Sequence, residues 1–324
     1  MKKNRLVFFL IILLVLASGG VLARMSSGRG GFGGGRGGRG GSGFTTQRGI
    51  SQGRQRLPNQ QFLNSRQSDS LFQWDVDPEF PQDFFTFVRI DYDYTDHSMG
   101  SSGRTSYGRV GRGGSMGGGR SRIDYPDSDN NFSYRLHQLT SIEVNPEPVY
   151  ITLQDPSLFE YPFIYMLETG SMRLLENDVK TLREYLLNGG FLMIDDFWRP
   201  DAWANVRNEM RRVFPDREPV LLTLEHPIFH CVFELKELPQ IPAWDIAVNR
   251  STDTLTGVTS ESGDPPRYYG IYDDKGRMMV IICRDTDLGD GWEREGQSHT
   301  FFKEFSEKKA YPLGINIVFY AMTH

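Results

Sequence analysis

Two adjacent carboxylates, Asp195 and Asp196, are the residues of this chain best placed to do chemistry. They follow a glycine pair and the short apolar run Phe191–Ile194, and Trp198 stands two residues further on. Such carboxylates could bind a metal, polarise a water molecule or accept hydrogen bonds from sugar hydroxyls, with the indole as a stacking face. The stretch is therefore a candidate ligand site.

A structural role for the same two residues is the alternative. Side chains alternate along a strand, so Asp195 and Asp196 would point to opposite faces unless a turn follows the strand. One of them would then cap the next helix, and the other would pair with Arg199 or Arg207. If the stretch does bind a ligand, Arg199 is expected to join the two carboxylates and Trp198 there.

A second acidic segment, residues 284–293, also follows an expected strand and should reach the same sheet edge. It fails the calcium-loop pattern, because Gly289 occupies the third ligand position and another glycine replaces the bidentate glutamate. A turn held by aspartate hydrogen bonds is the better prediction, and we expect no metal and no cofactor. The segment's candidate ligand-binding residues are Asp285, Asp287, Asp290 and Trp292.

The histidines and cysteines offer weaker signals. His226 and His230 would share a face only on a helix, and Pro227 argues against a helix there, so metal ligation by the pair is not expected. His226 remains a catalytic candidate. The chain has two cysteines, Cys231 and Cys283, and can therefore form at most one disulfide.

Short apolar strands alternate with amphipathic helices along the chain. This order predicts an α/β fold with a mostly parallel sheet, helices on both faces and the strands' carboxyl ends on one edge. Asp129 or Asn130 is expected to cap the first helix, and Gly189 to close the second. The strands are expected at residues 84–92, 149–153, 162–167, 191–194, 219–224, 267–272 and 278–283, and the helices at about 129–139, 174–188, 202–213 and 311–322.

The chain divides into segments of different composition. Residues 1–23 combine a basic start, an apolar run and a small-residue end, typical of a secretory signal or an uncleaved N-terminal anchor. Residues 24–78 are Gly- and Arg-rich and are predicted to be disordered. Residues 79–324 are predicted to form one α/β domain with a Gly/Arg-rich loop at 99–122. The protein is therefore expected to be exported, to the periplasm or beyond, or anchored to the inner membrane by residues 6–23.

Charge is divided unevenly between the arm and the domain. Residues 1–68 contain no acidic residue, whereas residues 69–324 hold 25 basic and 41 acidic residues. The basic arm is suited to touching anionic polymers or a partner in the cell envelope. For an exported protein we do not expect nucleic acid to be the partner, although Arg-Gly-Gly triplets resemble those of RNA-binding tails.

Five blocks of sequence occur in order along the chain: GGFLMIDDFW, VFPDREPV, HPIFH, DLGDGWE and AYPLGINIVFYAMTH. Together they resemble the bacterial domain of unknown function 4159 family across roughly residues 84–324. The resemblance implies a fold similar to class I glutamine amidotransferases, a flavodoxin-like three-layer sandwich; the family itself has no established activity. A shorter segment, residues 224–228, resembles the sugar-related ThuA-like relatives.

This resemblance places Asp196 where the amidotransferases carry a nucleophilic cysteine. Because a carboxylate is a far weaker nucleophile toward an amide, glutaminase activity is not expected. The leading hypothesis is a non-catalytic binding or assembly module. The alternatives are a hydrolase-like enzyme that uses Asp195, Asp196 and His226 on a sugar-like substrate, and polyanion or nucleic-acid binding through the Arg-Gly tail.

Overall fold

The computed structural model describes residues 74–75, 84–94 and 120–324, all of which belong to one compact unit. The predicted signal at 1–23, nearly all of the predicted arm at 24–78 and most of the 99–122 loop lie outside these residues. Among the helices of the described ranges, none combines the length and apolar character needed to cross a bilayer.

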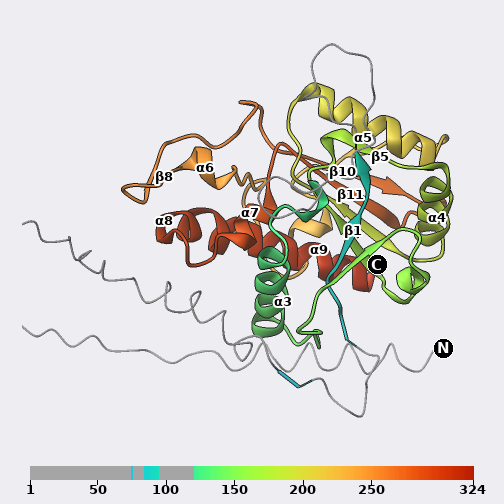
Figure 1. Ribbon diagram of the computed structural model, residues 1–324, viewed down its shortest axis with the longest axis horizontal. Helices are drawn as coiled ribbons and strands as arrows, with labels where there is room; N and C mark the ends of the chain where they lie inside the picture. Colours follow the sequence, from blue (N-terminus) through green and yellow to red (C-terminus); the bar gives the residue numbers. More distant parts are fainter. Residues whose placement is uncertain (1–73, 76–83, 95–119) are drawn as a thin grey trace, which may run out of the picture. The chain divides into compact units, whose positions relative to one another are not determined.

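A seven-stranded sheet forms the centre of this unit (Figure 1). Five neighbouring strands run parallel, while β10 is antiparallel to the strands on either side of it. The sheet is therefore mostly parallel, as the sequence predicts. In spatial order the strands are β3 (Val149–Thr152), β1 (Val88–Asp91), β4 (Phe163–Met166), β6 (Phe191–Ile194), β11 (Met278–Arg284), β10 (Arg267–Tyr272) and β7 (Val220–Leu221).

Helices pack on both faces of the sheet, which confirms the α/β prediction (Figure 1). Along β6, Phe191 and Met193 belong to one apolar cluster and Leu192 and Ile194 to the other, because strand side chains alternate. One face is covered by α4 (Glu176–Leu187) and α5 (Arg199–Val213), and the other by α3 (Asp127–Leu139), α7 (Leu288–Glu293) and α9 (Tyr311–Thr323).

Most helix and strand boundaries follow local sequence signals. Gly189 ends α4 with a φ of 113°, and the Gly190 N–H then donates to the Tyr185 carbonyl at 3.0 Å. The expected strand at 219–224 is shorter than predicted, since only Val220 and Leu221 pair with β10. Cys231 and Cys283 are both free thiols.

The predicted cap of the first helix was wrong. Helix α3 begins at Asp127 behind Pro126, and no side chain caps it. Asp129 instead lies inside the helix, fully buried, and pairs with the equally buried Arg89 of β1. A buried guanidinium must be matched by a carboxylate, and that requirement overrides the preference of aspartate for a cap position.

Short elements complete the described chain. A π-helical segment, η6 (Phe302–Ala310), joins α8 (His299–Phe301) to α9. The others are two small antiparallel pairs, β2 (Asp93–Tyr94) with β5 (Met172–Arg173) and β8 (Val248–Asn249) with β9 (Thr254–Leu255), the helix α6 (Trp244–Ala247), and the 3₁₀ turns η2 (Arg120–Arg122), η3 (Pro156–Glu160), η4 (Thr169–Ser171) and η5 (Pro227–Phe229).

Candidate functional site

The strand order reverses between β1 and β4, and the candidate site lies at the carboxyl edge near this reversal. From β1 the chain crosses to β3 on one side, and it then builds β4, β6 and β11 outward on the other. Open α/β sheets bind ligands where the order reverses in this way. Glu168 follows β4 and Asp196 follows β6 at this edge, so two carboxylates from different strands are available there.

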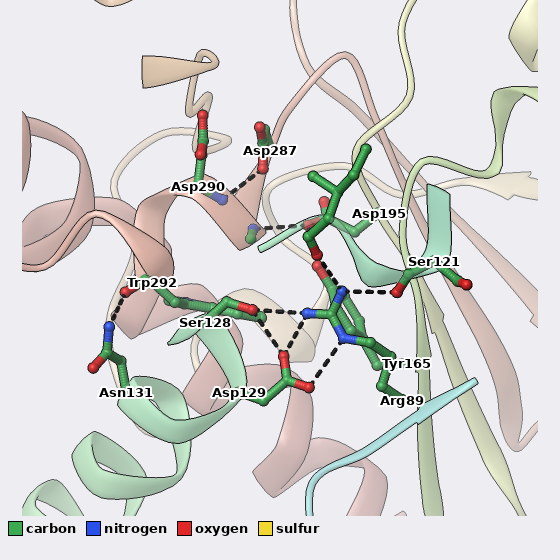
Figure 2. A network of polar contacts seen from close by, with 12 residues as sticks. Arg89, Ser121, Ser128, Asp129, Asn131, Tyr165, Asp195, Asp287, Asp290 and Trp292 are labelled. Atoms are coloured by element: carbon green, nitrogen blue, oxygen red, sulfur yellow. Dashed lines mark hydrogen bonds and ion pairs between the residues drawn. The ribbon is translucent and has the colours of Figure 1, made fainter. Parts of the chain in front are cut away.

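Asp195 turns toward the face covered by α7 (Figure 2). Its Oδ2 accepts hydrogen bonds from the Tyr165 hydroxyl at 3.0 Å and from the N–H groups of Leu288 and Gly289 at 2.9 and 3.2 Å. Burial raises the pKa of this carboxyl to about 7, because the loss of solvent outweighs the hydrogen bonds that favour its charged form. Asp195 thus anchors the first turn of α7 to the end of β6.

Asp196 faces a different space from its neighbour. Its backbone is left-handed, with a φ of 53°, and its Oδ1 accepts a hydrogen bond from the Trp198 indole N–H at 3.2 Å. Burial raises the pKa of the Asp196 carboxyl well above its usual range, and repulsion from Glu168 and Asp124 adds to the effect. Strand β6 ends at Ile194 and a turn follows, yet this turn does not bring both aspartates into one pocket, because Asp195 does not line the space that Asp196 faces.

Asp196 and Trp198 line a cavity of about 610 Å³ at the carboxyl edge. The cavity is only partly enclosed, and most of its lining is polar or charged. It joins the turn after β4, the turn after β6 and the first turn of α5. The lining residues are Arg120, Glu168, Gly170, Ser171, Asp196, Phe197, Trp198, Arg199, Asp201, Ala202 and Glu261.

The arginines of this cavity pair with carboxylates that line it too. Arg120 Nη1 lies 2.7 Å from Glu168 Oε2, and Arg199 Nε lies 3.7 Å from Asp201 Oδ1. Neither Asp195 nor Asp196 pairs with Arg199 or Arg207 among the ion pairs of the described residues, and neither caps α5. Within the described residues, the two structural roles expected from the sequence are therefore not found, and Asp195 has a different structural role at α7.

The second acidic segment ends in the helix α7, and its aspartates have structural partners. Asp287 caps the helix by accepting the Asp290 N–H at 2.7 Å, and Asp290 accepts the Trp244 N–H at 2.6 Å. Asp285 accepts the Ser262 hydroxyl at 2.8 Å. These three residues and Trp292 do not line the 610 Å³ cavity.

Trp292 belongs to the core and not to a binding surface. Its side chain is fully buried, and its ring packs against those of Phe87, Phe132 and Tyr165. Its carbonyl accepts the Asn131 side-chain amide at 2.6 Å, which ties α7 to α3 (Figure 2). A ligand in the cavity has no access to this indole.

Gly289 lets carboxylates approach α7 closely. A Cβ at this position would lie 2.7 Å from Asp124 Oδ2 and 3.3 Å from Asp287 Oδ1. Burial raises the pKa of Asp124 well above its usual range, and repulsion from Asp290 and Glu293 raises it further. A glycine is therefore needed where these acidic groups converge.

Asp124, Asp290 and Glu293 are the described residues whose spacing would suit a hard cation. One oxygen from each lies within 4.8 Å of the others. Arg294, however, already pairs with two of them, at 3.0 Å from Asp290 Oδ1 and 2.6 Å from Glu293 Oε2. These ion pairs neutralise Asp290 and Glu293, and Asp124 is the third carboxyl of the cluster.

The predicted site residue His226 lies elsewhere. Its Nδ1 accepts the Ile228 N–H at 3.2 Å, and its Nε2 lies 3.2 Å from the Tyr272 hydroxyl, at the end of β10 away from the cavity. Burial lowers the pKa of His226, and the neighbouring His324 lowers it further. The structure therefore does not bring His226 together with Asp195 and Asp196.

Sequence reasoning missed four charged residues of the cavity, Glu168, Arg120, Glu261 and Asp201, the last of which lies in the first turn of α5. Glu168 could have been found, because it follows the expected strand at 162–167 and so must reach the same edge as Asp196. Arg120 lies at the end of a Gly/Arg-rich tract whose composition hides it. Glu261 comes from a polar connection with no motif, and only the tertiary fold brings it to the cavity.

Comparison with known proteins supports the family resemblance. None of the curated proteins compared matches the chain. The family model described as Domain of unknown function (DUF4159) matches residues 108–322, which cover two elements of the cavity edge, the turns after β4 and β6. The chain therefore belongs to the DUF4159 family.

Proposed function

We propose that this protein binds a polar, hydroxyl-rich ligand of the sugar type in the 610 Å³ cavity and does not act as a glutaminase. The observation that carries the proposal is the position of Asp196. A buried carboxylate, hydrogen-bonded to an indole, opens into a polar cavity beside the reversal of strand order. Sugar sites combine such carboxylates with an aromatic face and arginine donors, and Trp198 and Arg199 supply these here.

The proposed fold type within the α/β class is flavodoxin-like. Numbered along the chain, the five parallel strands take the spatial order two, one, three, four, five. That order is the flavodoxin-like one, and it has its ligand position between the first and third strands. Glu168 follows the third of these strands, in agreement with a ligand at this position.

The turn at Asp196 supports a distant similarity to class I glutamine amidotransferases. A nucleophile elbow holds its nucleophile in a strained turn directly after a strand, and Asp196 has a left-handed backbone two residues after β6. The residue is a carboxylate, however, and burial raises the pKa of the Cys283 thiol, which is fully enclosed in β11. These features argue against thiol acyl chemistry.

A hydrolase-like activity on a glycoside is the second candidate. Asp196 and Glu168 both line the cavity, and repulsion between them contributes to the raised pKa of Asp196. A carboxyl with a raised pKa can serve as a general acid beside a second carboxylate. Release of a chromogenic aglycone from aryl glycosides, lost in Asp196→Asn, would favour this candidate over pure binding.

Export and contacts made by the basic arm remain proposals. Residues 1–23 have the pattern of a signal or anchor, and residues 24–68 carry arginines without acids. Fractionation of cells that produce the full chain would test export, and a chain that remains in the cytosol would contradict it. Salt-dependent binding to an anionic polymer, lost when residues 24–68 are deleted, would support a role of the arm.

Calorimetric titration with neutral monosaccharides and disaccharides tests the binding proposal. Binding to the wild-type chain should weaken in Asp196→Asn and in Trp198→Phe, which keeps an aromatic face but removes the N–H donor of the hydrogen bond. Glu218→Gln, which removes an exposed carboxylate paired with Arg207 and Arg211 outside the cavity, should bind as the wild type does. Failure of every sugar to bind, or equal binding by all three variants, would contradict the proposal.

A further inference from the structure

The charges that line the cavity do not balance. Its two arginines each have a carboxylate partner within the cavity, Glu168 for Arg120 and Asp201 for Arg199. Asp196 and Glu261 remain, and within the described chain neither has an ion pair with a basic residue. The cavity therefore carries surplus negative charge.

Of the carboxylates that line the cavity, Asp196 is the one whose negative charge most needs a positively charged partner. Its side chain is buried, with the residue only 8 % exposed, and the one hydrogen bond that it receives from the described part of the chain comes from a neutral indole. The charged groups around it include four further carboxylates, Glu168, Asp124, Asp195 and Asp290. An uncompensated buried carboxylate is costly, so a ligand that brings a positive charge to it gains more than a neutral ligand does.

The same charges oppose an anion. A phosphate or carboxylate in this cavity would face Asp196, Glu168 and Glu261, and the only guanidinium groups of the lining already contact carboxylates. Like charges at such short range are repulsive, and burial increases the repulsion.

The size of the cavity favours an organic cation over a bare metal ion. Its volume of about 610 Å³ falls in the range of sites for small organic molecules. Arg199 and Asp201 stand at its exposed part, where both can exchange hydrogen bonds with ligand hydroxyls. Phe197 and Trp198 add apolar surface against which a ring can pack.

We infer that the cavity takes a ligand that carries a protonated amine together with hydroxyl groups, an amino sugar in chemical class, and that the ammonium group lies against Asp196. This inference rests on the proposed function, because it specifies which hydroxyl-rich ligand the same cavity binds. Asp196 supplies the charge, Glu261 adds to the field, and the Arg199–Asp201 pair contacts the hydroxyl groups.

Titration of the full chain with three probes tests the inference. Glucosamine carries the ammonium group, N-acetylglucosamine replaces it with a neutral amide, and glucose replaces it with a hydroxyl. One charge-assisted contact should make glucosamine bind roughly tenfold to a hundredfold tighter than either neutral probe. Asp196→Asn should reduce glucosamine binding to the level of glucose. Glu218→Gln, which removes an exposed carboxylate outside the cavity, should keep the preference.

A pH series on the wild type tests the inference without any substitution, so it does not depend on whether a variant folds. As pH falls the amine stays protonated, while Asp196, whose pKa is raised by burial and by neighbouring carboxylates, gains a proton. Glucosamine binding should therefore weaken as pH falls, and glucose binding should not.

The outcomes separate this inference from the proposed function. Equal affinity of the wild type for all three probes would overturn the amine preference and leave sugar binding intact. Binding of none of them would remove both. Stoichiometric binding of calcium chloride alone that competes with glucosamine and is lost in Asp196→Asn would show that the site takes a metal ion, which overturns the inference.

Discussion

Arg89 and Asp129 form an ion pair in which both side chains are completely withdrawn from solvent. The guanidinium also donates to the Ser128 hydroxyl and to the carbonyls of Ser121 and Ile123, so all five of its N–H groups have acceptors (Figure 2). This pair ties α3 and the segment before it to β1, beside the carboxyl edge where the cavity opens.

Breaking this pair should strongly destabilise the fold. Asp129→Asn leaves a buried, unpaired guanidinium, and we expect the free energy of unfolding to fall by about 3–5 kcal/mol. Urea unfolding followed by circular dichroism measures the loss. Glu218→Gln, which removes an exposed partner of two arginines, should leave the midpoint unchanged. A midpoint for Asp129→Asn equal to that of Glu218→Gln would contradict a structural role for the buried pair.

Because of Asp195, we expect the free energy of unfolding to fall as pH rises from about 4 to about 7. Its pKa is raised from 3.8 to about 7, so the native state binds this proton more tightly than the unfolded state does. The stabilising contribution is complete below about pH 4 and is lost as pH rises through 7, by up to about 4 kcal/mol at roughly 1.4 kcal/mol per pH unit.

Asp195→Asn should therefore flatten the pH dependence of stability between about pH 4 and pH 7, measured as urea midpoints at several pH values. Asp155→Asn is the opposite case, because hydrogen bonds from Ser157 lower the pKa of that exposed carboxyl. Replacing Asp155 should remove a contribution to the free energy of unfolding that grows as pH rises. A wild-type slope that survives in Asp195→Asn would place the titrating group elsewhere.

Two substitutions of Asp196 should differ in stability but not in binding, because the backbone at this position is strained. A φ of 53° costs an ordinary side chain energy that glycine avoids. Compared with Asp196→Ala, Asp196→Gly should raise the free energy of unfolding by about 1 kcal/mol. Both variants lose the carboxylate and should lose ligand binding, so their difference isolates the strain. Equal melting temperatures for the two variants would show that the turn stores no strain.

The close approach of Asp124 to α7 should make Gly289 intolerant of a side chain. Gly289→Ala places a Cβ 2.7 Å from Asp124 Oδ2 and 3.2 Å from the Tyr165 hydroxyl, and we expect a loss of about 1–3 kcal/mol in unfolding free energy. Adding Asp124→Ala removes the nearest atom and should recover part of the loss. If the double variant is as unstable as the sum of the two single variants, the contact is not the cause.

Local signals were sufficient to predict most of the fold. The run at 191–194 is a strand with those limits, and the hairpin between β10 and β11 lies where the sequence predicts it. Asp129 shows where such signals fail, because its preference for a cap position yields to a buried arginine 40 residues away in the chain. A local sequence pattern does not reveal an ion pair between residues that lie far apart in the chain.

The candidate site was predicted only in part. Asp196, Trp198 and Arg199, three of the predicted ligand-binding residues, line the cavity, because they follow a strand whose carboxyl end reaches that edge of the sheet; that they bind a ligand stays a prediction. His226 was expected among them, yet the segment after β7 carries it to the far end of β10. A one-dimensional pattern places a residue after a strand but does not tell which way the following turn leads.

The sequence by itself determined the alternation of strands and helices, the parallel sheet and the two carboxylates at its edge, because periodicity and turn residues act within a few positions of one another. Only the tertiary structure decided that Asp195 anchors α7 while Asp196 opens into the cavity, and that Glu168, Arg120 and Glu261 join it there. Those assignments depend on contacts between residues far apart in the chain and on how burial alters their charge, and both arise only when the chain is packed.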